Sequence, residues 1–337
     1  MPQGKDQQTL SFQKKLLLVA IVAVLLWIAK ATFNVLLLIL AGALIALYFN
    51  GLSGLLQRTF HLPAKWSLPL GIVGSLMFVV LFFWLAGTRL GQQVQQLSET
   101  LPSTIEKAEQ WLGQSSIGQK VLDEIKSDGN MQKASSTVKS FFRSTFGILG
   151  DAYIILFLGL FFTASPKSYV NGFLALFSPD AKTKAEGVVN NVGMTLTKWL
   201  KGKIFSMLIV TTLTIVGLLI IGVPMAFTLG IMAGILNFIP NFGPLIALIP
   251  AVLVGLLQSP TIALLVAGLY ILVQVLESNV ITPQIQKRLI SLPPALIIVA
   301  QLFMGVLTGG WGLVLATPIV AILMVVVQEL WVKKHGG

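Results

Sequence analysis

Hydrophobic residues dominate this chain in long unbroken runs, and polar residues are confined to the gaps between them. The longest run, from Ile204 to Leu276, contains no Lys, Arg, Asp, Glu or His, and a second uncharged run extends from Leu289 to Gln328. A water-soluble domain cannot bury that much continuous apolar chain, whereas a bilayer accommodates it as several helices of about 20 residues each. The pattern predicts an all-α, polytopic membrane protein.

The N-terminal part, residues 1–87, is predicted to contain membrane helices. Leu16–Ala29 and Phe33–Phe49 are apolar and almost contiguous, so we expect a helical hairpin that turns near Lys30 to Asn34. A cleaved signal peptide over the first segment is the less favoured alternative. Trp66–Ala86 follows as a third span.

The next part of the chain is polar and predicts structure outside the bilayer. In residues 88–145, Gln, Ser, Lys and Glu dominate, and apolar residues recur at helical spacing, which predicts a small extracytoplasmic region of amphipathic helices. Residues 146–164 form a fourth span. Residues 165–203 are predicted to be a cytoplasmic loop with an interfacial amphipathic helix. That helix should begin at Ser178-Pro179-Asp180, where an N-cap residue, a proline and an acid occur in sequence.

The C-terminal part, residues 204–331, is interrupted by proline and glycine, and a short tail, 332–337, follows it. Gly222-Val223-Pro224 should end a fifth span, and Pro240–Pro244 separates two apolar pieces that are short for a full crossing. Thr261–Thr282 is long enough to span and should end at Pro283.

A second interrupted segment follows Leu292-Pro293-Pro294 and is broken at Gly309–Gly312. In both segments a proline, Pro224 or Pro294, precedes the glycine break, and a second proline, Pro250 or Pro318, follows it. Paired broken hairpins are typical of secondary transporters with inverted repeats. Whether 225–257 and 292–331 cross the membrane or re-enter stays open at this point.

The charges are few and asymmetric. The net charge is +11, with 10% charged residues and no cysteine in 337 residues. If the chain reverses at each apolar segment, most basic residues and both termini lie on the cytoplasmic side, which follows the positive-inside rule. The basic balance therefore indicates contact with lipid headgroups rather than nucleic acid. Two histidines, no cysteine and no glycine-rich phosphate loop argue against an enzyme, a metal site, a cofactor or ATP-driven transport.

One carboxylate interrupts the apolar C-terminal part. Glu277 follows the longest uncharged run, and an ionisable side chain at membrane depth costs at least about 2.5 kcal/mol. One interpretation is a proton- or cation-binding group in a water-filled cavity, with Gln274 and Asn279 as further candidates. The other is a structural hydrogen-bonding group, paired with Lys287 or Arg288. Asp151 is a second acid in the apolar region, and we favour an interfacial position for it.

The breaks supply candidates for a gate or solute path. An opened backbone could line the path, and a plain interhelical turn is an equally good interpretation. The glycines near 309 could be a hinge, but close packing of helices is favoured. The candidate residues are Asn237, Pro240, Asn241, Gly243, Pro244, Pro250, Pro283, Gly309, Gly310 and Gly312.

Several motifs resemble one family in their order along the chain. These are Trp199-Leu200-Lys201-Gly202, Gly222-Val223-Pro224, Asn237 to Pro244, Ile249-Pro250-Ala251, Gln274 with Glu277 and Asn279, Leu292-Pro293-Pro294 and Ala316-Thr317-Pro318. Together they resemble the AI-2E family, also called the PerM-like permeases. The resemblance implies a bacterial inner-membrane protein with about seven to eight spans. It also implies export of the signal autoinducer-2 or sodium(lithium)/proton antiport, the activities described for members.

The leading hypothesis is a secondary carrier or exporter of a small polar metabolite, coupled to protons or to an ion at Glu277. Na⁺(Li⁺)/H⁺ antiport is the first alternative. The second is a non-transporting membrane scaffold that binds a partner through residues 88–145. The patches of small residues favour a homo-oligomer in the lipid bilayer.

Overall fold

The computed structural model describes residues 12–85, 87–88, 150–286 and 293–332. These residues form helices and short connections, with no strand among them, which confirms the predicted all-α membrane fold. Within them, five helices are long and apolar enough to cross a membrane, and a sixth span is possible if the bent pair Gly150–Ala164 and Pro166–Leu174 counts as one. The predicted extracytoplasmic region lies, from residue 89 on, outside the described residues.

The first helix contradicts the predicted N-terminal hairpin. Helix α1 runs without a break through Phe12–Phe60, 49 residues, so the turn expected near Lys30–Asn34 is wrong. Residues 30–34 contain neither glycine nor proline, and a polar lysine alone does not stop a helix. The predicted cytoplasmic position of the N-terminus depended on this turn, because a single crossing by α1 would place the N-terminus on the other side of the membrane. The side on which the N-terminus lies stays a prediction.

The chain reverses after α1 and packs back on it. His61 has a positive φ of 54° at the turn, and the helix Ala64–Leu85 follows. The two helices are joined by polar contacts, since Ser53 Oγ lies 2.8 Å from Ser67 Oγ and Tyr48 OH lies 3.0 Å from Ser75 Oγ. These hydroxyls satisfy one another, as polar groups between membrane helices must.

Helix α6 is the central element, and it joins two predicted segments into one. It spans Pro179–Ile221, 43 residues, and begins with Ser178 at the N-cap in extended conformation and Pro179 in the first turn, as predicted. It ends at Gly222, whose φ of 82° is a conformation that glycine adopts readily. No break separates the amphipathic part from the apolar part at Lys203, so the helix expected in the interface and the fifth span are a single helix. The position of its first half relative to the membrane stays a prediction.

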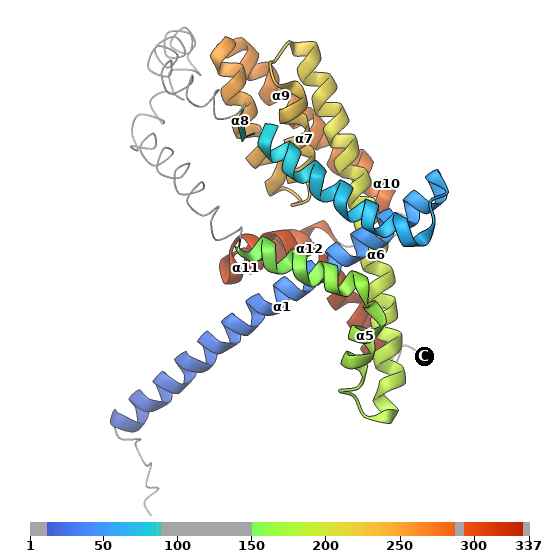
Figure 1. The fold of residues 1–337 in the computed structure, drawn as a ribbon. Coiled ribbons are helices and arrows are strands. Elements are labelled where there is room, and N and C mark those ends of the chain that lie inside the picture. The colour runs from blue at the N-terminus through green and yellow to red at the C-terminus, as the bar shows by residue number, and fades with distance from the viewer. Residues whose placement is uncertain (1–11, 86, 89–149, 287–292, 333–337) are drawn as a thin grey trace, which may run out of the picture.

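Two bundles are built along α6 (Figure 1). The apolar half of α6 packs with α7 (Ala226–Leu236), α8 (Phe242–Gln258) and α9 (Pro260–Leu276) around a core that includes Leu218, Leu229, Ala247 and Val266. The first half of α6 packs with α1, the helix Gly150–Ala164, α11 (Pro294–Thr308) and α12 (Gly310–Val327) around a second core. Leu37, Ile155, Leu196 and Leu315 are members of that second core. The junction of the two bundles lies near the middle of α6.

The glycines of the second bundle allow close helix crossings. A Cβ on Gly42 of α1 would lie 2.7 Å from Leu158 Cβ, and a Cβ on Gly159 would overlap Ile45. These two glycines therefore set the crossing of α1 with Gly150–Ala164. Small residues at such contacts are the usual device of membrane helices, which lack a hydrophobic force between them.

The span that carries Glu277 does not end as predicted. Helix α9 passes into a π-helical turn, η1 (Glu277–Ile281), and then into α10 (Thr282–Gln286). Pro283 therefore lies inside the helical segment and does not close it. In the wider turn the amide of Thr282 bonds the carbonyl of Glu277, five residues back, and this change of register accommodates a proline one residue later. The chain ends, within the described residues, with the π-helical turn η2 (Gln328–Val332) after α12.

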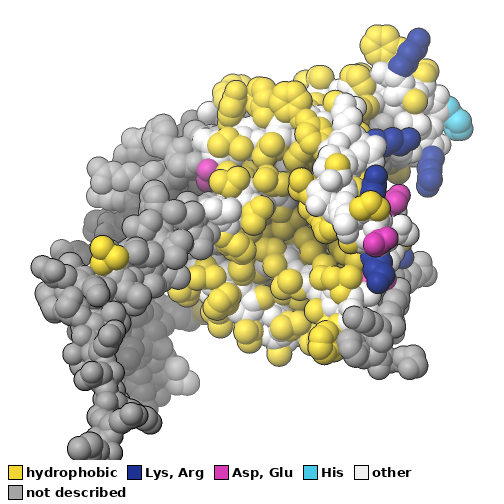
Figure 2. All heavy atoms as spheres, turned by 90° about the horizontal axis from the view of Figure 1, so that it is seen from below, with side chains coloured by type: hydrophobic (Ala, Val, Ile, Leu, Met, Phe, Trp, Pro, Cys, Tyr) yellow, Lys and Arg dark blue, Asp and Glu magenta, His cyan; other side chains and the backbone are white. Residues whose placement is uncertain are grey.

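The surface fits an apolar environment. On the face shown in Figure 2, hydrophobic side chains cover most of the described surface, and most of the charged side chains gather toward one edge. Large exposed apolar side chains occur on nearly every long helix, including Phe78, Phe161, Phe205 and Leu264. An apolar surface of this extent is suited to lipid rather than to water.

Candidate functional site

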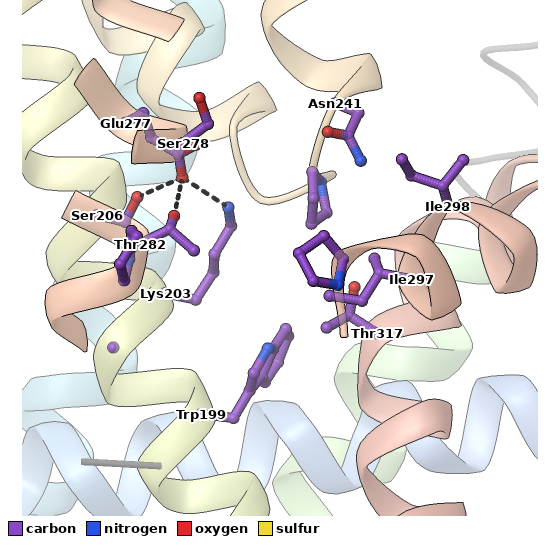
Figure 3. Close-up of a pocket in the computed structure, with 14 residues that line it drawn as sticks. Trp199, Lys203, Ser206, Asn241, Glu277, Ser278, Thr282, Ile297, Ile298 and Thr317 are labelled. Carbon is purple, nitrogen blue, oxygen red and sulfur yellow. Dashed lines mark hydrogen bonds and ion pairs between the residues drawn. The ribbon is translucent and has the colours of Figure 1, made fainter. Parts of the chain in front are cut away.

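A cavity of about 210 Å³ lies where the two bundles meet on α6. Polar and apolar side chains line different parts of it (Figure 3). The lining residues are Trp199, Gly202, Lys203, Ser206, Pro240, Asn241, Glu277, Ser278, Thr282, Pro283, Pro294, Ile297, Ile298 and Thr317. At about 30 Å³ per water in the liquid, the volume suits a few water molecules or one small solute.

Glu277 lies at the polar side of the cavity, where α9 changes into the π-helical turn. It is 8% exposed. Its Oε1 accepts hydrogen bonds from Ser206 Oγ and from Thr282 Oγ1, each at 3.0 Å. Thr282 is five residues further along the chain, so the π-turn is what brings its hydroxyl to the carboxylate. Single π-turns of this kind are frequent at functional sites.

Lys203 of α6 is the cation that faces this carboxylate. Its Nζ lies 3.8 Å from Glu277 Oε1, and both side chains are about nine-tenths buried. Lys203 and Ser206 are three residues apart and therefore share one face of α6. The alternative pairing of Glu277 with Lys287 or Arg288 stays a prediction, since both residues lie outside the described part of the chain.

A hydrogen-bond chain connects this carboxylate to the first helix break. Asn237, 1% exposed at the C-terminal end of α7, donates from Nδ2 to Ser206 Oγ at 3.2 Å. Phe238 next to it packs edge-on against Trp199 of α6, with ring centroids 5.7 Å apart. The tip of the α7–α8 hairpin therefore rests on α6 beside the Lys203–Glu277 pair.

The same tip is also held from the other bundle. Gln301 of α11, which is fully buried, donates from Nε2 to the carbonyl oxygen of Pro240 at 2.8 Å. Its Oε1 accepts from Asn241 Nδ2 at 3.0 Å. Proline and the positive φ of 65° at Asn241 prevent a regular helix here, and Gln301 satisfies the polar groups that the break leaves open.

The predicted site residues divide into three groups. Glu277, Pro240, Asn241 and Pro283 line the cavity, and Asn237 reaches it through Ser206. Gln274 and Asn279 do not line it, because Asn279 is exposed and bonds the carbonyl of Val275. The remaining residues of the predicted gate, Gly243, Pro244, Pro250, Gly309, Gly310 and Gly312, lie outside the cavity lining.

Two of those glycines have a packing role instead. A Cβ on Gly243 would overlap the carbonyl oxygen of Leu236, and a Cβ on Gly312 would overlap the carbonyl oxygen of Met304. Each glycine lies in the first turn of the second helix of its hairpin and lets that turn approach the end of the first helix. The geometry therefore favours close packing at Gly243 and Gly312, whereas a Cβ on Gly309 or Gly310 would meet nothing within 4 Å.

Sequence inspection missed Lys203, Ser206, Thr282, Gln301 and Thr317 as members of the site. One signal was present, because Lys203 and Glu277 are the charged residues that bound the uncharged run Ile204–Leu276. From Lys203 the chain continues through the rest of α6 and then through α7, α8 and α9. At Glu277 it lies beside Lys203 again. No local pattern marks Gln301, which is a single amide in an apolar helix.

Asp151 lies away from the cavity, near the break of the second hairpin. Its Oδ2 accepts a hydrogen bond from Trp311 Nε1 at 2.6 Å. Trp311 belongs to the first turn of α12, so this contact ties the tip of the α11–α12 hairpin to the helix Gly150–Ala164. The side chain is partly buried.

The fold and this site define a polytopic helical membrane protein of the transporter class, with a small polar cavity between two helical hairpins. The chain belongs to the AI-2E family, since the model of the AI-2E family transporters matches residues 16–331.

Curated relatives carry transport names. The chain is 26% identical to the putative transport protein YueF of Bacillus subtilis over 57% of this chain and 53% of that protein. It is 31% identical to the AI-2 transport protein TqsA of Escherichia coli over 31% of this chain and 30% of that protein. It is also 24% identical to the putative permease PerM of Escherichia coli over 57% of this chain and 56% of that protein. In these matches the chain spans about half or less of the relatives' length.

Proposed function

We propose that this protein is a secondary carrier that moves a small polar solute through the cavity between its two bundles. The observation that carries the proposal is the position of Glu277, a buried carboxylate that lines the cavity beside Lys203 and is bonded by Ser206 and Thr282. An ionisable group in the apolar interior is costly to keep, and such groups are typical of proton or ion pathways. Glu277 is the proposed site of the coupling proton.

The contacts around the cavity also supply a gate. The tip of the α7–α8 hairpin touches α6 through Asn237 and touches α11 through Gln301. Irregular backbone at membrane depth is tolerated where it lines a cavity, and carriers of this kind expose such a site alternately to the two sides. We propose that the hairpin tip separates from Gln301 when the cavity opens toward one side of the membrane.

The geometry favours a proton over sodium as the coupling ion. Lys203 Nζ lies 3.8 Å from the carboxylate oxygen, so a sodium ion at Glu277 would be repelled by an ammonium group in a region of low dielectric. Na⁺(Li⁺)/H⁺ antiport at this carboxylate is therefore the weaker alternative. Since TqsA carries the name of an AI-2 transport protein, autoinducer-2 is the first solute to test.

The experiment is transport by the full-length chain in proteoliposomes with an imposed pH gradient. Autoinducer-2 and a panel of small polar metabolites are added singly, and solute flux and internal pH are measured together. We expect Glu277→Gln to reduce flux driven by the pH gradient at least tenfold. The matched control is Glu186→Gln, an exposed acid on the same long helix α6, which should transport as the wild type does. Full rate and unchanged pH dependence in Glu277→Gln would refute the coupling role.

A further inference from the structure

The cavity has two unlike walls. Lys203 and Glu277 are the charged side chains among the described residues that line it, and the hydroxyls of Ser206 and Thr282 surround them. On the opposite side lie Ile297 and Ile298 of α11 and Thr317 of α12 (Figure 3). The described parts of α8, α10, α11 and α12 add no charged side chain to this lining.

Lys203 and Glu277 attract each other by charge, but their side chains do not form a hydrogen bond. A charge-assisted N–H···O bond is about 2.7–2.9 Å long, whereas the Lys203 Nζ lies 3.8 Å from Glu277 Oε1. That oxygen already accepts bonds from two hydroxyls. An ammonium group has three donors. Lys203 therefore has donor capacity directed at the cavity that Glu277 does not use.

A second unused polar group lies across the cavity. The hydroxyl of Thr317, a residue only 3% exposed, has no hydrogen-bond partner within the described structure. Buried hydroxyls are nearly always bonded, and an orphaned one in the wall of a cavity indicates a missing acceptor or donor there. Lys203 and Thr317 thus present hydrogen-bonding groups to the cavity from two of its sides.

The charges restrict what this occupant can be. With Glu277 ionised the pair is neutral, and with Glu277 protonated the buried Lys203 is left without a counter-charge. An unpaired buried charge is strongly disfavoured. A small anion that enters as the proton binds would restore neutrality, and it would accept from both Lys203 and Thr317.

We infer that the solute is a small monovalent anion that replaces the carboxylate of Glu277 as the partner of Lys203, and that it is carried together with one proton bound to Glu277. The inference rests on the proposed carrier function and names its substrate class. The loaded site holds the ammonium, the anion and the protonated acid, and its net charge of zero, counted over the described lining residues, equals that of the site without anion and proton. The proton and the anion therefore enter together, and each favours binding of the other to the same extent.

The test is anion binding by the purified full-length chain in detergent, independent of transport. Acetate, lactate and dihydrogen phosphate are the anionic probes, and glycerol is the neutral probe of similar size. Because one proton is linked to each anion, the affinity of the best anion should rise about tenfold for each unit by which the pH is lowered, over the range in which Glu277 is ionised. An indicator dye in weakly buffered solution should report uptake of one proton per bound anion.

Variants separate the two charged groups. Glu277→Gln imitates the protonated acid, so it should bind the anion with the same affinity at each pH and take up no proton. Lys203→Gln should lose at least tenfold in affinity, whereas the exposed neighbour Lys201→Gln should bind as the wild type does. Thr317→Val removes the second contact and should lose about threefold, with the helical circular dichroism unchanged in every variant.

Three results would overturn the inference: wild-type anion affinity that does not change with pH, no binding of any anionic probe, or undiminished binding by Lys203→Gln. If neutral solutes cross with a rate that depends on Glu277 while no anion binds, the substrate class is wrong and the carrier function stands. If Glu277→Gln transports its solute at full rate with unchanged pH dependence, the coupling role of Glu277 fails, and if the wild type transports none of the solutes, the proposed carrier function itself fails.

Discussion

The two helical hairpins use the same local construction but meet the cavity differently. In α7–α8 and in α11–α12, the second helix begins next to a glycine whose missing Cβ makes room for a carbonyl oxygen of the first helix. The α7–α8 hairpin presents its tip to the cavity, through Pro240 and Asn241. The α11–α12 hairpin presents the start of α11 and the middle of α12, and its tip is bonded to Asp151 instead.

This difference shows that a repeated pattern of proline and glycine can determine where the chain turns without determining what each turn contacts. The paired prolines and glycines, Pro224 with Gly243 and Pro294 with Gly312, mark two turns in which a glycine of the second helix lies close to the end of the first helix, although five residues connect α7 to α8 and only Gly309 connects α11 to α12. The polar residues that give each turn its partner are not repeated, since Asn237 has no equivalent near Gly309. The tips therefore differ in their long-range contacts, and we propose a gating role for the first tip alone. Three predictions test this comparison.

The largest effect is expected from the glycines on which both hairpins depend. Gly243→Val and Gly312→Val each place a side chain against backbone that cannot move without separating the two helices, so each should cost about 3 kcal/mol or more of stability. Thermal unfolding in detergent measures this. Gly310→Ala and Gly268→Ala, where an added Cβ meets nothing within 4 Å, are the matched controls. If only one of the two hairpins proves sensitive, the construction is not shared.

An intermediate effect is expected where the hairpins touch each other. Gln301→Met keeps a side chain of similar length and removes both bonds to the tip, so the carbonyl of Pro240 keeps only its bond from the Phe242 amide and the side-chain amide of Asn241 loses its acceptor. The expected cost is about 2 kcal/mol. A double-mutant cycle with Asn241→Ala should return a coupling energy of about 1 kcal/mol, because the two side chains are in contact. Additive effects would contradict a direct link between the hairpins.

The smallest effect is expected at the far tip. Trp311→Phe preserves the ring but removes the donor to Asp151, and we expect a loss of about 1 kcal/mol because the bond is only partly buried. Transport through the cavity should be unchanged. A transport defect as large as that of Gln301→Met would show that the second tip also belongs to the gate.

Much of the fold could be predicted from local signals. Proline at Pro179, glycine at Gly222 and the proline-rich segment at Pro240–Pro244 each act within one turn of backbone, so the pattern of the sequence locates them. The expected hairpin near Lys30 failed because no residue there breaks a helix. The expected end at Pro283 failed because a π-helical turn accommodates that proline. At Lys30 the signal was polarity, which does not break a helix, and at Pro283 the signal was a proline whose effect depends on the local register of the helix.

The sequence by itself determined the membrane class, the family and the positions of most helix breaks, and it marked Glu277 as a candidate site residue. These properties depend on hydrophobic length, on local backbone preference and on the cost of one carboxylate in apolar chain. Tertiary structure alone decided that Lys203 faces Glu277, that Gln301 holds the first hairpin tip and that Thr317 lines the cavity without a partner. Those contacts join residues far apart in the chain, and only the packing of the two bundles on α6 brings them together.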